Sequence, residues 1–345
     1  KFYSDLTGNA SGVAGSVTDM QGSTHSIIDV SLDHTGYEAA RKKAESYSDT
    51  AIVVVGRAGG EGSDAVMDMT PYSKLNRGKM TNYNEGGDGG KHYLELMDVE
   101  LDLVNYVKSN YKNVIILVNS PMPIELGFTE TTANTGADAK GDIDSVIWMG
   151  LPGSTGNRGV VQVLTGEVSP SGRLPDTWAY EMESAPSYYN FGDYTYLTES
   201  GEVIMGPAFN DRTSAVKYVH YEESIYIGYR WYETANAENV KLTNIGNFQY
   251  NNTTYEDADR KFTYDGGKVV GAEQKNFDFS NYNSVVQYAF GTGLSYADFK
   301  MEFDGAPAYD AKTNNFTFKV KVTNTSDTYT AKTPVMLYVE QPYDK

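Results

Sequence analysis

The sequence contains no cysteine among its 345 residues and only four histidines. The absence of cysteine excludes disulfide bonds, thiol catalysis and thiolate zinc sites in this chain. The four histidines are widely separated, and no two of them have the spacing of a ligand pair on a helix: His25, His34, His92 and His220. We therefore expect neither a metal site nor another cofactor.

Basic residues are also scarce relative to acidic ones. The chain has 28 lysines and arginines against 46 aspartates and glutamates, a formal net charge of −18. Nucleic acids and anionic membranes attract basic surfaces, so this balance argues against both as partners. No hydrophobic run approaches the roughly 20 residues of a membrane-spanning helix. The acidic excess suits a neutral substrate, or it keeps the surface soluble. Because the chain starts at Lys1 rather than Met, we expect it to be part of a longer protein.

The first half of the chain alternates between two kinds of apolar pattern. Three apolar runs are typical of strands buried on both faces of a parallel sheet: Ala51 to Val55, Asn113 to Val118 and Ser145 to Met149. Three segments with helical spacing of apolar residues lie around them: Tyr37 to Tyr47, Met97 to Tyr111 and Gly156 to Leu164. Gly166 follows the last of these as a C-terminal cap. This alternation predicts an α/β fold, an open and mostly parallel sheet sandwiched by helices.

The rest of the chain changes character twice. From about residue 181 to 290, Tyr, Asn, Asp and Gly dominate without periodicity, which is typical of a loop-rich extension. Beyond Phe299, the segments Asn315 to Thr323 and Thr333 to Val339 predict antiparallel strands that begin a β-sandwich. We therefore expect an N-terminal extension (1–35), an α/β-sandwich domain that includes the loop-rich extension (36–298) and a partial β-sandwich domain (299–345).

The glycine-rich loop from Gly56 to Asp64 is the best candidate for chemistry. It follows a predicted strand directly, and ligands of open α/β sheets bind beyond the carboxyl ends of the strands. A phosphate cradle is one interpretation, but the loop lacks the spacing of phosphate-binding motifs, and Glu61 and Asp64 would repel phosphate. A second interpretation is that Glu61 approaches a sugar closely, because the flanking glycines leave it unobstructed. A third is a tight turn with a solvated glutamate.

Five segments, in order along the chain, resemble signature sequences of glycoside hydrolase family 3. They are Gly60-Glu61-Gly62, Asn113 to Glu125, Thr165 to Thr177, Tyr221 to Arg230 and Phe290 to Tyr296. The third, which contains Ser-Gly-Arg-Leu-Pro, is the most diagnostic. Ser224 and Ala289 replace a Gly and a Pro that are usual in the family, and the Arg that many members carry after Asp64 is missing.

The resemblance implies a retaining, exo-acting β-glycosidase, first of all a β-glucosidase that removes terminal non-reducing β-D-glucosyl residues from a β-glucoside or a short β-linked oligosaccharide. Glu61 would be the acid/base residue, and Arg57 and Asp64 would bind substrate. The nucleophilic Asp would come from the family's (β/α)8 barrel, which is absent from this chain and would be its partner, in the same gene product or in a second chain. In a subgroup with reversed domain order, residues 299–345 would begin a fibronectin type III-like domain.

Other readings of the same residues stay open. The protein could be a β-xylosidase, an α-arabinofuranosidase or a transferase of the same family, or a carbohydrate-binding or structural module without catalysis. The Tyr-rich, Lys-over-Arg composition favours an extracellular or cell-surface location. Lys91-His92 superficially matches a sugar-holding pair in the family's barrel, which we interpret as coincidence. We assign Trp148 to the core, whereas Trp178 and Trp231 could pack there or stack on a sugar.

Overall fold

The computed structural model describes residues 28–29, 32, 37–57, 59, 65, 84–85, 91–130, 143–188, 194–207, 213–218, 221, 223–245, 251–257, 260–265 and 275–338. Glu61 and Asp64 lie outside the described residues. The chain divides into two compact units, one of Lys1–Leu151 with Trp178–Gln287 and the other of Pro152–Thr177 with Tyr288–Lys345.

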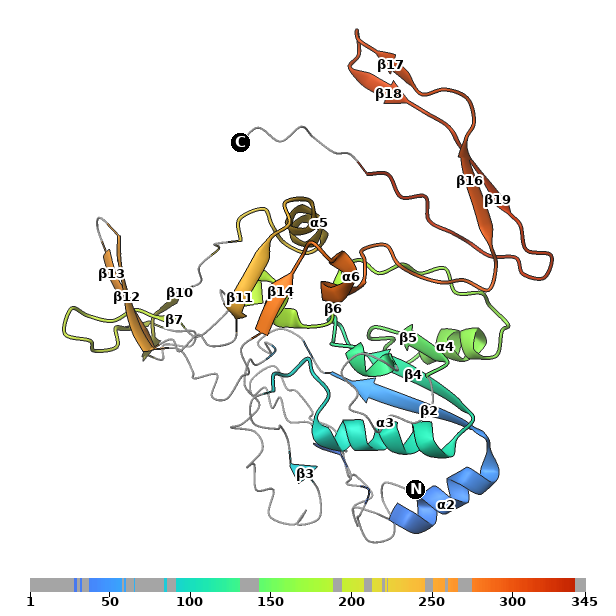
Figure 1. Cartoon of the computed structure of the whole chain (residues 1–345), viewed down its shortest axis with the longest axis horizontal. Coiled ribbons are helices and arrows are strands. Elements are labelled where there is room, and N and C mark those ends of the chain that lie inside the picture. The colour runs from blue at the N-terminus through green and yellow to red at the C-terminus, as the bar shows by residue number, and fades with distance from the viewer. Residues whose placement is uncertain are drawn as a thin grey trace. The chain divides into compact units, whose positions relative to one another are not determined.

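A three-stranded parallel sheet of order β2-β4-β5 is the main sheet of the first unit (Figure 1). Its strands are the three that the apolar runs predict: β2 (Thr50–Gly56), β4 (Asn113–Asn119) and β5 (Ser145–Trp148). β4 pairs with both neighbours, so that Ile116 lies opposite Val53 on one side and Val146 on the other. The α/β fold with a parallel sheet is thereby confirmed.

The two strands β2 and β4 differ in burial. In β4, Val114, Ile116 and Val118 are at most 1% exposed, as expected for a central strand. In β2, Val53 is buried but Ile52 and Val54 are 50% and 58% exposed. The expectation that β2 is buried on both faces was wrong. β2 is the edge strand of this sheet, and no element among the described residues covers the face with Ile52 and Val54.

Two helices accompany the sheet where helical spacing predicts them. α3 (Asp98–Asn110) packs against β2 and β4 and buries Val99, Val104 and Val107 (Figure 1). α2 (Tyr37–Tyr47) buries no side chain completely, and its last residue, Tyr47, is 91% exposed. In the described part of the chain, no helix has the length and apolar character needed to cross a membrane.

The region predicted as loop-rich contains many short elements. They are β6 (Trp178–Ala179), η3 (Met182–Ser184), η4 (Pro186–Tyr188), β7 (Tyr194–Thr195), β8 (Met205–Pro207), β9 (Thr213–Ala215), β10 (Lys217–Tyr218), α5 (Tyr229–Ala237), β11 (Lys241–Ile245), β12 (Asn251–Asp257), β13 (Arg260–Asp265), β14 (Lys275–Asp278), α6 (Tyr282–Val285) and β15 (Val286–Tyr288). Antiparallel pairs form between β7 and β10, β8 and β9, β11 and β14, and β12 and β13. A further pair, β1 (Ile28–Asp29) with β3 (Asn84–Glu85), lies earlier in the chain.

Helix α5 is the main element in this region that the sequence did not predict. Only two of its residues, Tyr232 and Ala235, are buried, which is too few to produce a clear apolar period. Its position depends on distant contacts. The Trp231 indole N–H donates to the carbonyl of Ser184 at 2.9 Å, and the Tyr232 hydroxyl lies 3.0 Å from the Ser184 hydroxyl.

The second unit contains α4 (Asn157–Leu164) and two antiparallel strand pairs. Gly166 has a φ of +73° and donates its N–H to the carbonyl of Val163, which confirms it as the residue that ends α4. β16 (Phe299–Phe303) pairs with β19 (Val320–Asn324), and β17 (Ala308–Asp310) pairs with β18 (Asn315–Thr317). This antiparallel arrangement agrees with the expected start of a β-sandwich.

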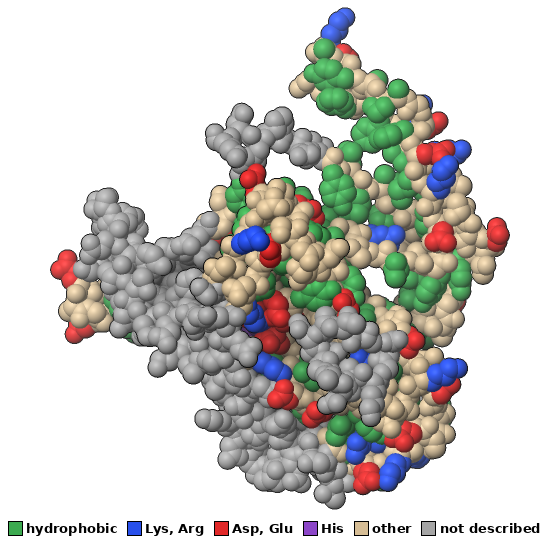
Figure 2. All heavy atoms as spheres, in the orientation of Figure 1, with side chains coloured by type: hydrophobic (Ala, Val, Ile, Leu, Met, Phe, Trp, Pro, Cys, Tyr) green, Lys and Arg blue, Asp and Glu red, His purple; other side chains and the backbone are tan. Residues whose placement is uncertain are grey.

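Two details of this unit differ from the prediction. The single strand expected from Asn315 to Thr323 is broken between β18 and β19, because its two halves pair with different strands. Residues 333–338 form no strand, and residue 339 lies outside the described residues. Large hydrophobic side chains of this unit are exposed (Figure 2), among them Phe303 at 64%, Phe316 at 73% and Leu337 at 65%.

Candidate active site

The carboxyl ends of the three parallel strands meet at one edge of the sheet, where ligands of such folds bind. Arg57 follows β2 and donates its backbone N–H to the carbonyl of Asn119 at the end of β4, at 3.0 Å. The Trp148 indole N–H, from the end of β5, donates to the carbonyl of Ser120 at 2.7 Å. The loop that carries Glu61 therefore starts at this edge, while Glu61 and Asp64 themselves lie outside the described residues.

Arg57 is held on all sides by the protein. Its side chain has no exposed area. Nη1 and Nη2 each donate to one oxygen of Glu100 at 2.7 Å. The other three N–H groups donate to backbone carbonyls: Nε to Tyr93 at 2.6 Å, Nη1 to Gly56 at 2.7 Å and Nη2 to Glu95 at 2.5 Å. A guanidinium group has five N–H donors, so all of them are in use.

This geometry does not agree with the expectation that Arg57 binds substrate. A contact with a sugar hydroxyl would require a free donor and an accessible side chain, and Arg57 has neither. Instead, its guanidinium joins the end of β2 to the turn that precedes α3.

The partner of Arg57 has a second task at the start of α3. Glu100 is the third residue of the helix, and its Oε2 also accepts the backbone N–H of Met97 at 2.9 Å. A glutamate at this position commonly reaches back to the residue that precedes the helix, which satisfies one of the unpaired N–H groups there. Glu100 is thus bonded both to the helix start and to Arg57, and α3 packs on the sheet.

Gly59, two residues after Arg57, lies close to the side chains of the segment after β4. A Cβ atom on Gly59 would lie 2.9 Å from Cγ of Pro121 and 3.1 Å from Cε of Met122. Only glycine permits this close approach without displacement of those side chains. The segment after β4 is itself fixed, because the Ser120 hydroxyl bonds both the carbonyl and the N–H of Met122, at 2.7 and 3.1 Å.

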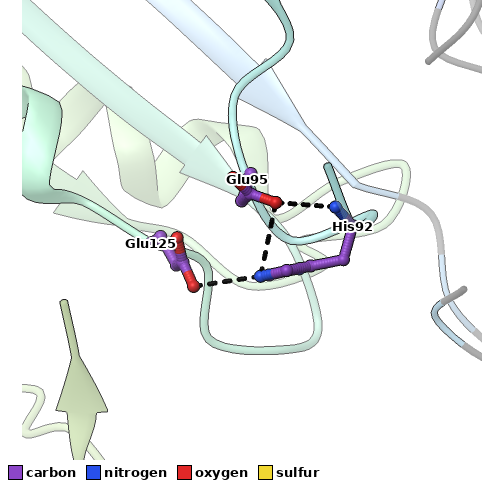
Figure 3. A group of neighbouring side chains, drawn as sticks. All are labelled: His92, Glu95 and Glu125. Atoms are coloured by element: carbon purple, nitrogen blue, oxygen red, sulfur yellow. Dashed lines mark hydrogen bonds and ion pairs between the residues drawn. The ribbon is translucent and has the colours of Figure 1, made fainter. Parts of the chain in front are cut away.

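The same turn before α3 carries a buried cluster of charged side chains (Figure 3). His92 is 2% exposed, and its Nε2 lies 3.0 Å from Glu125 Oε1, 3.6 Å from Glu95 Oε2 and 3.8 Å from Glu183 Oε2. The His92 backbone N–H donates to Glu95 Oε2 at 2.6 Å. The Met182 N–H donates to Glu125 Oε1, also at 2.6 Å. The cluster therefore joins the turn, the segment after β4 and η3.

Lys275 on β14 extends this cluster toward the surface. Its ammonium lies 2.5 Å from Glu181 Oε2 and 3.0 Å from Glu183 Oε1. Beside this pair is a hollow of about 430 Å³ with a mixed polar and aromatic lining: Tyr180, Glu181, Lys275, Asn276, Phe277, Asn283 and Ser284. Because Glu181 and Lys275 are bonded to each other, we interpret the hollow as the outer end of the charged cluster.

The pKa values in the cluster are shifted upward, that of His92 by the neighbouring carboxylates and those of the glutamates by burial. Burial disfavours charge on His92, but the carboxylates of Glu125, Glu95 and Glu183 outweigh it and raise the pKa of His92 to about 9. The Leu94 backbone N–H lies 3.2 Å from Nδ1, and this contact by itself favours the neutral ring. Burial raises the pKa of Glu95 and of Glu125 above the ordinary glutamate value, although His92 opposes this.

The pKa values of Glu181 and Lys275, at the outer end of the cluster, are also shifted upward. Burial raises the pKa of Glu181, although Lys275 opposes this. Burial disfavours the charged ammonium of Lys275, but Glu183 and Glu181 outweigh it and raise the lysine pKa above its usual range.

The donor atoms of this cluster are close enough to share a cation. In the part of the chain that the structure describes, two groups have ligand atoms within 4.8 Å of one another: His92, Glu95 and Glu125, and Glu125, Glu181 and Glu183. The sequence does not indicate such a grouping, because it brings no two histidines together. His92 and Lys275 already provide the positive charge that these buried carboxylates require. The chemistry therefore fits an internal ion-pair network.

Several sequence-based assignments can be compared with this geometry. Lys91-His92 belongs to the turn before α3, and His92 contributes to the buried cluster, which spacing alone did not reveal. Trp178 is 1% exposed and meets Trp148 edge to face at 5.7 Å, so it packs in the core and does not present its ring to a ligand in solution. For the buried charged cluster, the sequence contained one signal. Glu125 follows a buried strand by a few residues, and ligand-binding groups of α/β folds gather at such positions.

Comparisons with known proteins identify the relatives of this chain. A family model, the glycosyl hydrolase family 3 C-terminal domain, matches residues 5–229. A beta-glucosidase of Ruminococcus albus is 29% identical over 246 residues, which cover 71% of this chain and 20% of that protein. Beta-glucosidase A of Butyrivibrio fibrisolvens is 28% identical over 261 residues, which cover 75% of this chain and 22% of that protein.

A solved structure shows the same fold. A beta-glucosidase from Paenibacillus barengoltzii matches 84% of this chain and 21% of its own, with a TM-score of 0.51 and 22% sequence identity. The chain spans about a fifth of the length of all three proteins. Because the family model covers well over half of the chain, the chain belongs to the glycosyl hydrolase family 3 C-terminal domain family.

Proposed function

We propose that the protein carrying this chain is a retaining β-glucosidase and that Glu61 is its acid/base residue. The observation that carries the proposal is that the Gly60-Glu61-Gly62 loop begins at the carboxyl edge of a parallel sheet in a domain of glycosyl hydrolase family 3. The relatives from Ruminococcus albus and Butyrivibrio fibrisolvens are named as beta-glucosidases, which supports the choice of substrate class.

In this mechanism Glu61 protonates the glycosidic oxygen as the aglycone departs, and a nucleophilic Asp attacks the anomeric carbon. Glu61 then removes a proton from the water that releases the sugar. Retention requires the two carboxyl groups to lie ~5 Å apart. We propose that the Asp belongs to the family's (β/α)8 barrel, on which the loop from Gly56 to Asp64 docks.

The remaining residues of the loop have separate tasks in this proposal. Asp64 lies three residues after Glu61 and is the candidate for a hydrogen bond to a sugar hydroxyl. Arg57 stays inside the protein, where its contacts with Glu100, Tyr93 and Glu95 hold the start of the loop. Residues 299–345 would then begin the fibronectin type III-like domain of the same protein.

The test uses the full-length protein with Glu61→Ala, and Glu199→Ala as a matched control at an exposed glutamate. Loss of a general acid costs ~10²–10⁴ in rate, and the loss is largest for poor leaving groups. We expect Glu61→Ala to lose most of its activity on cellobiose and much less on 2,4-dinitrophenyl β-glucoside. Azide should restore turnover and yield a β-glycosyl azide.

Two other outcomes would contradict the proposal in different ways. Wild-type rates of Glu61→Ala on both substrates would remove Glu61 from the active site. Activity of the unaltered protein on aryl β-xylosides or α-arabinofuranosides, without activity on β-glucosides, would keep the mechanism and replace the sugar. A full-length protein that cleaves none of these glycosides would be a binding or structural module.

A further inference from the structure

The buried ion pair between Arg57 and Glu100 lies at the base of the Glu61 loop. We propose that this pair is a positioning device, which sets where the loop leaves the sheet and thereby where Glu61 is presented. The inference rests on the proposed function, because it assigns a task to Arg57 and Glu100 in that same site.

The first argument is the location of the pair. Glu61 is four residues after Arg57, and the intervening residues are Ala58, Gly59 and Gly60. Four residues span at most roughly 14 Å, so an error in direction at Arg57 is carried directly to Glu61. Small residues have little side chain with which to anchor a loop. We therefore assign the direction in which the loop starts to the contacts at its base.

The second argument is the type of interaction. A buried ion pair is a poor source of net stability, since apolar residues of similar size often do as well. The planar fork of arginine does provide orientation, because two parallel N–H groups match two carboxylate oxygens. In Arg57 the remaining donors also bond the carbonyls of Gly56, Tyr93 and Glu95, so the guanidinium joins the strand end to the turn before α3.

The third argument is that the far side of the pair is bonded to other elements of the domain. Glu100 accepts the Met97 N–H at the start of α3, and α3 packs on β2 and β4. The turn that supplies the Tyr93 and Glu95 carbonyls is fixed by His92, whose Nε2 bonds Glu125. On the opposite side of the loop, Gly59 lies against Pro121 and Met122. The base of the loop is thus held between two fixed segments.

The test measures how hydrolysis depends on the leaving group in the full-length protein. Glu100→Gln keeps the size of the side chain but removes its charge. Arg57→Lys keeps a positive charge but removes the two parallel N–H groups that bond the carboxylate of Glu100. Displacement of a catalytic group by about 1 Å can cost roughly 10²-fold in rate. We expect kcat/KM to fall about 10- to 100-fold on aryl β-glucosides with poor leaving groups and less than about threefold on 2,4-dinitrophenyl β-glucoside.

The matched control is Glu38→Gln, which makes the same change in an exposed ion pair with Lys42. It should leave the rates on every substrate unchanged. A pair that only stabilises the fold would lower the amount of active protein, and the rates on all leaving groups would then fall by the same factor. Such a uniform fall, or wild-type rates in a variant that folds, would overturn the proposal. If Glu100→Gln does not fold, Arg57→Lys provides the same readout.

The Glu61→Ala variant separates this inference from the proposed function. If Glu61→Ala shows no dependence on the leaving group, the assignment of Glu61 fails and the pair has no acid/base residue to position. If Glu61→Ala shows the dependence and the Arg57 and Glu100 variants do not, only the positioning role is wrong.

Discussion

The Nε2 atom of His92 lies 3.0 Å from Oε1 of Glu125 in a place where His92 is 2% exposed. The two residues are 33 positions apart, and they connect the turn before α3 with the segment after β4. Both segments adjoin the base of the Glu61 loop, through the carbonyls of Tyr93 and Glu95 on one side and through Pro121 and Met122 on the other.

The His92 pair predicts that stability decreases at alkaline pH. The folded pKa of His92 is about 9, above its ordinary value of 6.5, so the folded protein binds this proton more tightly. The stabilising contribution is complete below about pH 6.5 and is lost as the pH rises through about 9. One proton corresponds to at most about 1.4 kcal/mol per pH unit. Calorimetry between pH 7 and 10 should show a falling midpoint, and His92→Gln should have a flatter profile in this window. Parallel profiles for both proteins would contradict the prediction.

Lys275 predicts that its replacement destabilises the protein more at alkaline than at acidic pH. Lys275→Met leaves Glu181 and Glu183 without their cation, and the carboxylates must then either take up protons or stay charged in a largely buried place. Protonation is easier at low pH, so we expect a loss of about 1–3 kcal/mol at pH 8 and a smaller loss at pH 5. Thermal midpoints of the variant and the unaltered protein at the two pH values provide the measurement.

The control for Lys275 is Lys241→Met, which breaks an exposed ion pair with Asp278. Exposed pairs are worth about 1 kcal/mol or less, so this variant should change the midpoint little at either pH. Equal losses for Lys275→Met and Lys241→Met would show that the buried network has no special contribution.

Trp178 predicts a packing defect without a defect in sugar binding. Its indole is 1% exposed and meets Trp148 edge to face, so Trp178→Ala should cost about 3–5 kcal/mol of unfolding free energy. Tyr47→Ala, at a side chain that is 91% exposed, should stay within about 0.5 kcal/mol. Denaturant unfolding measures both. If Trp178→Phe remains folded but loses affinity for glucose, Trp178 contributes to sugar binding and this prediction is wrong.

Local patterns were sufficient for the main elements of the first unit. The apolar runs predicted β2, β4 and β5, and helical spacing predicted α2 and α3, because each signal lies within a single segment of the chain. The same kind of signal failed for α5, where only Tyr232 and Ala235 are buried. It also failed for the strand expected from Asn315 to Thr323, because its division between two partners is a property of the pairing and not of the alternation.

The glycine-rich loop was visible in the sequence, but the residues that hold it were not. Arg57 bonds Glu100, which is 43 residues away, and three carbonyls that have no sequence signal at all. The resemblance to the family implied a substrate contact for Arg57. The burial of the guanidinium and its contacts within the protein, which only the folded chain shows, favour an internal role.

By itself the sequence determined the fold class, the family and the position of Glu61 soon after an apolar strand, since all three depend on contiguous residues. The tertiary structure decided which charges meet. His92, Glu125, Glu183 and Lys275 come from four separate segments, and the parallel sheet with its appended short elements brings them into one buried cluster. A buried charge requires a partner within a few ångströms, and only the folded chain can supply one from so far along the sequence.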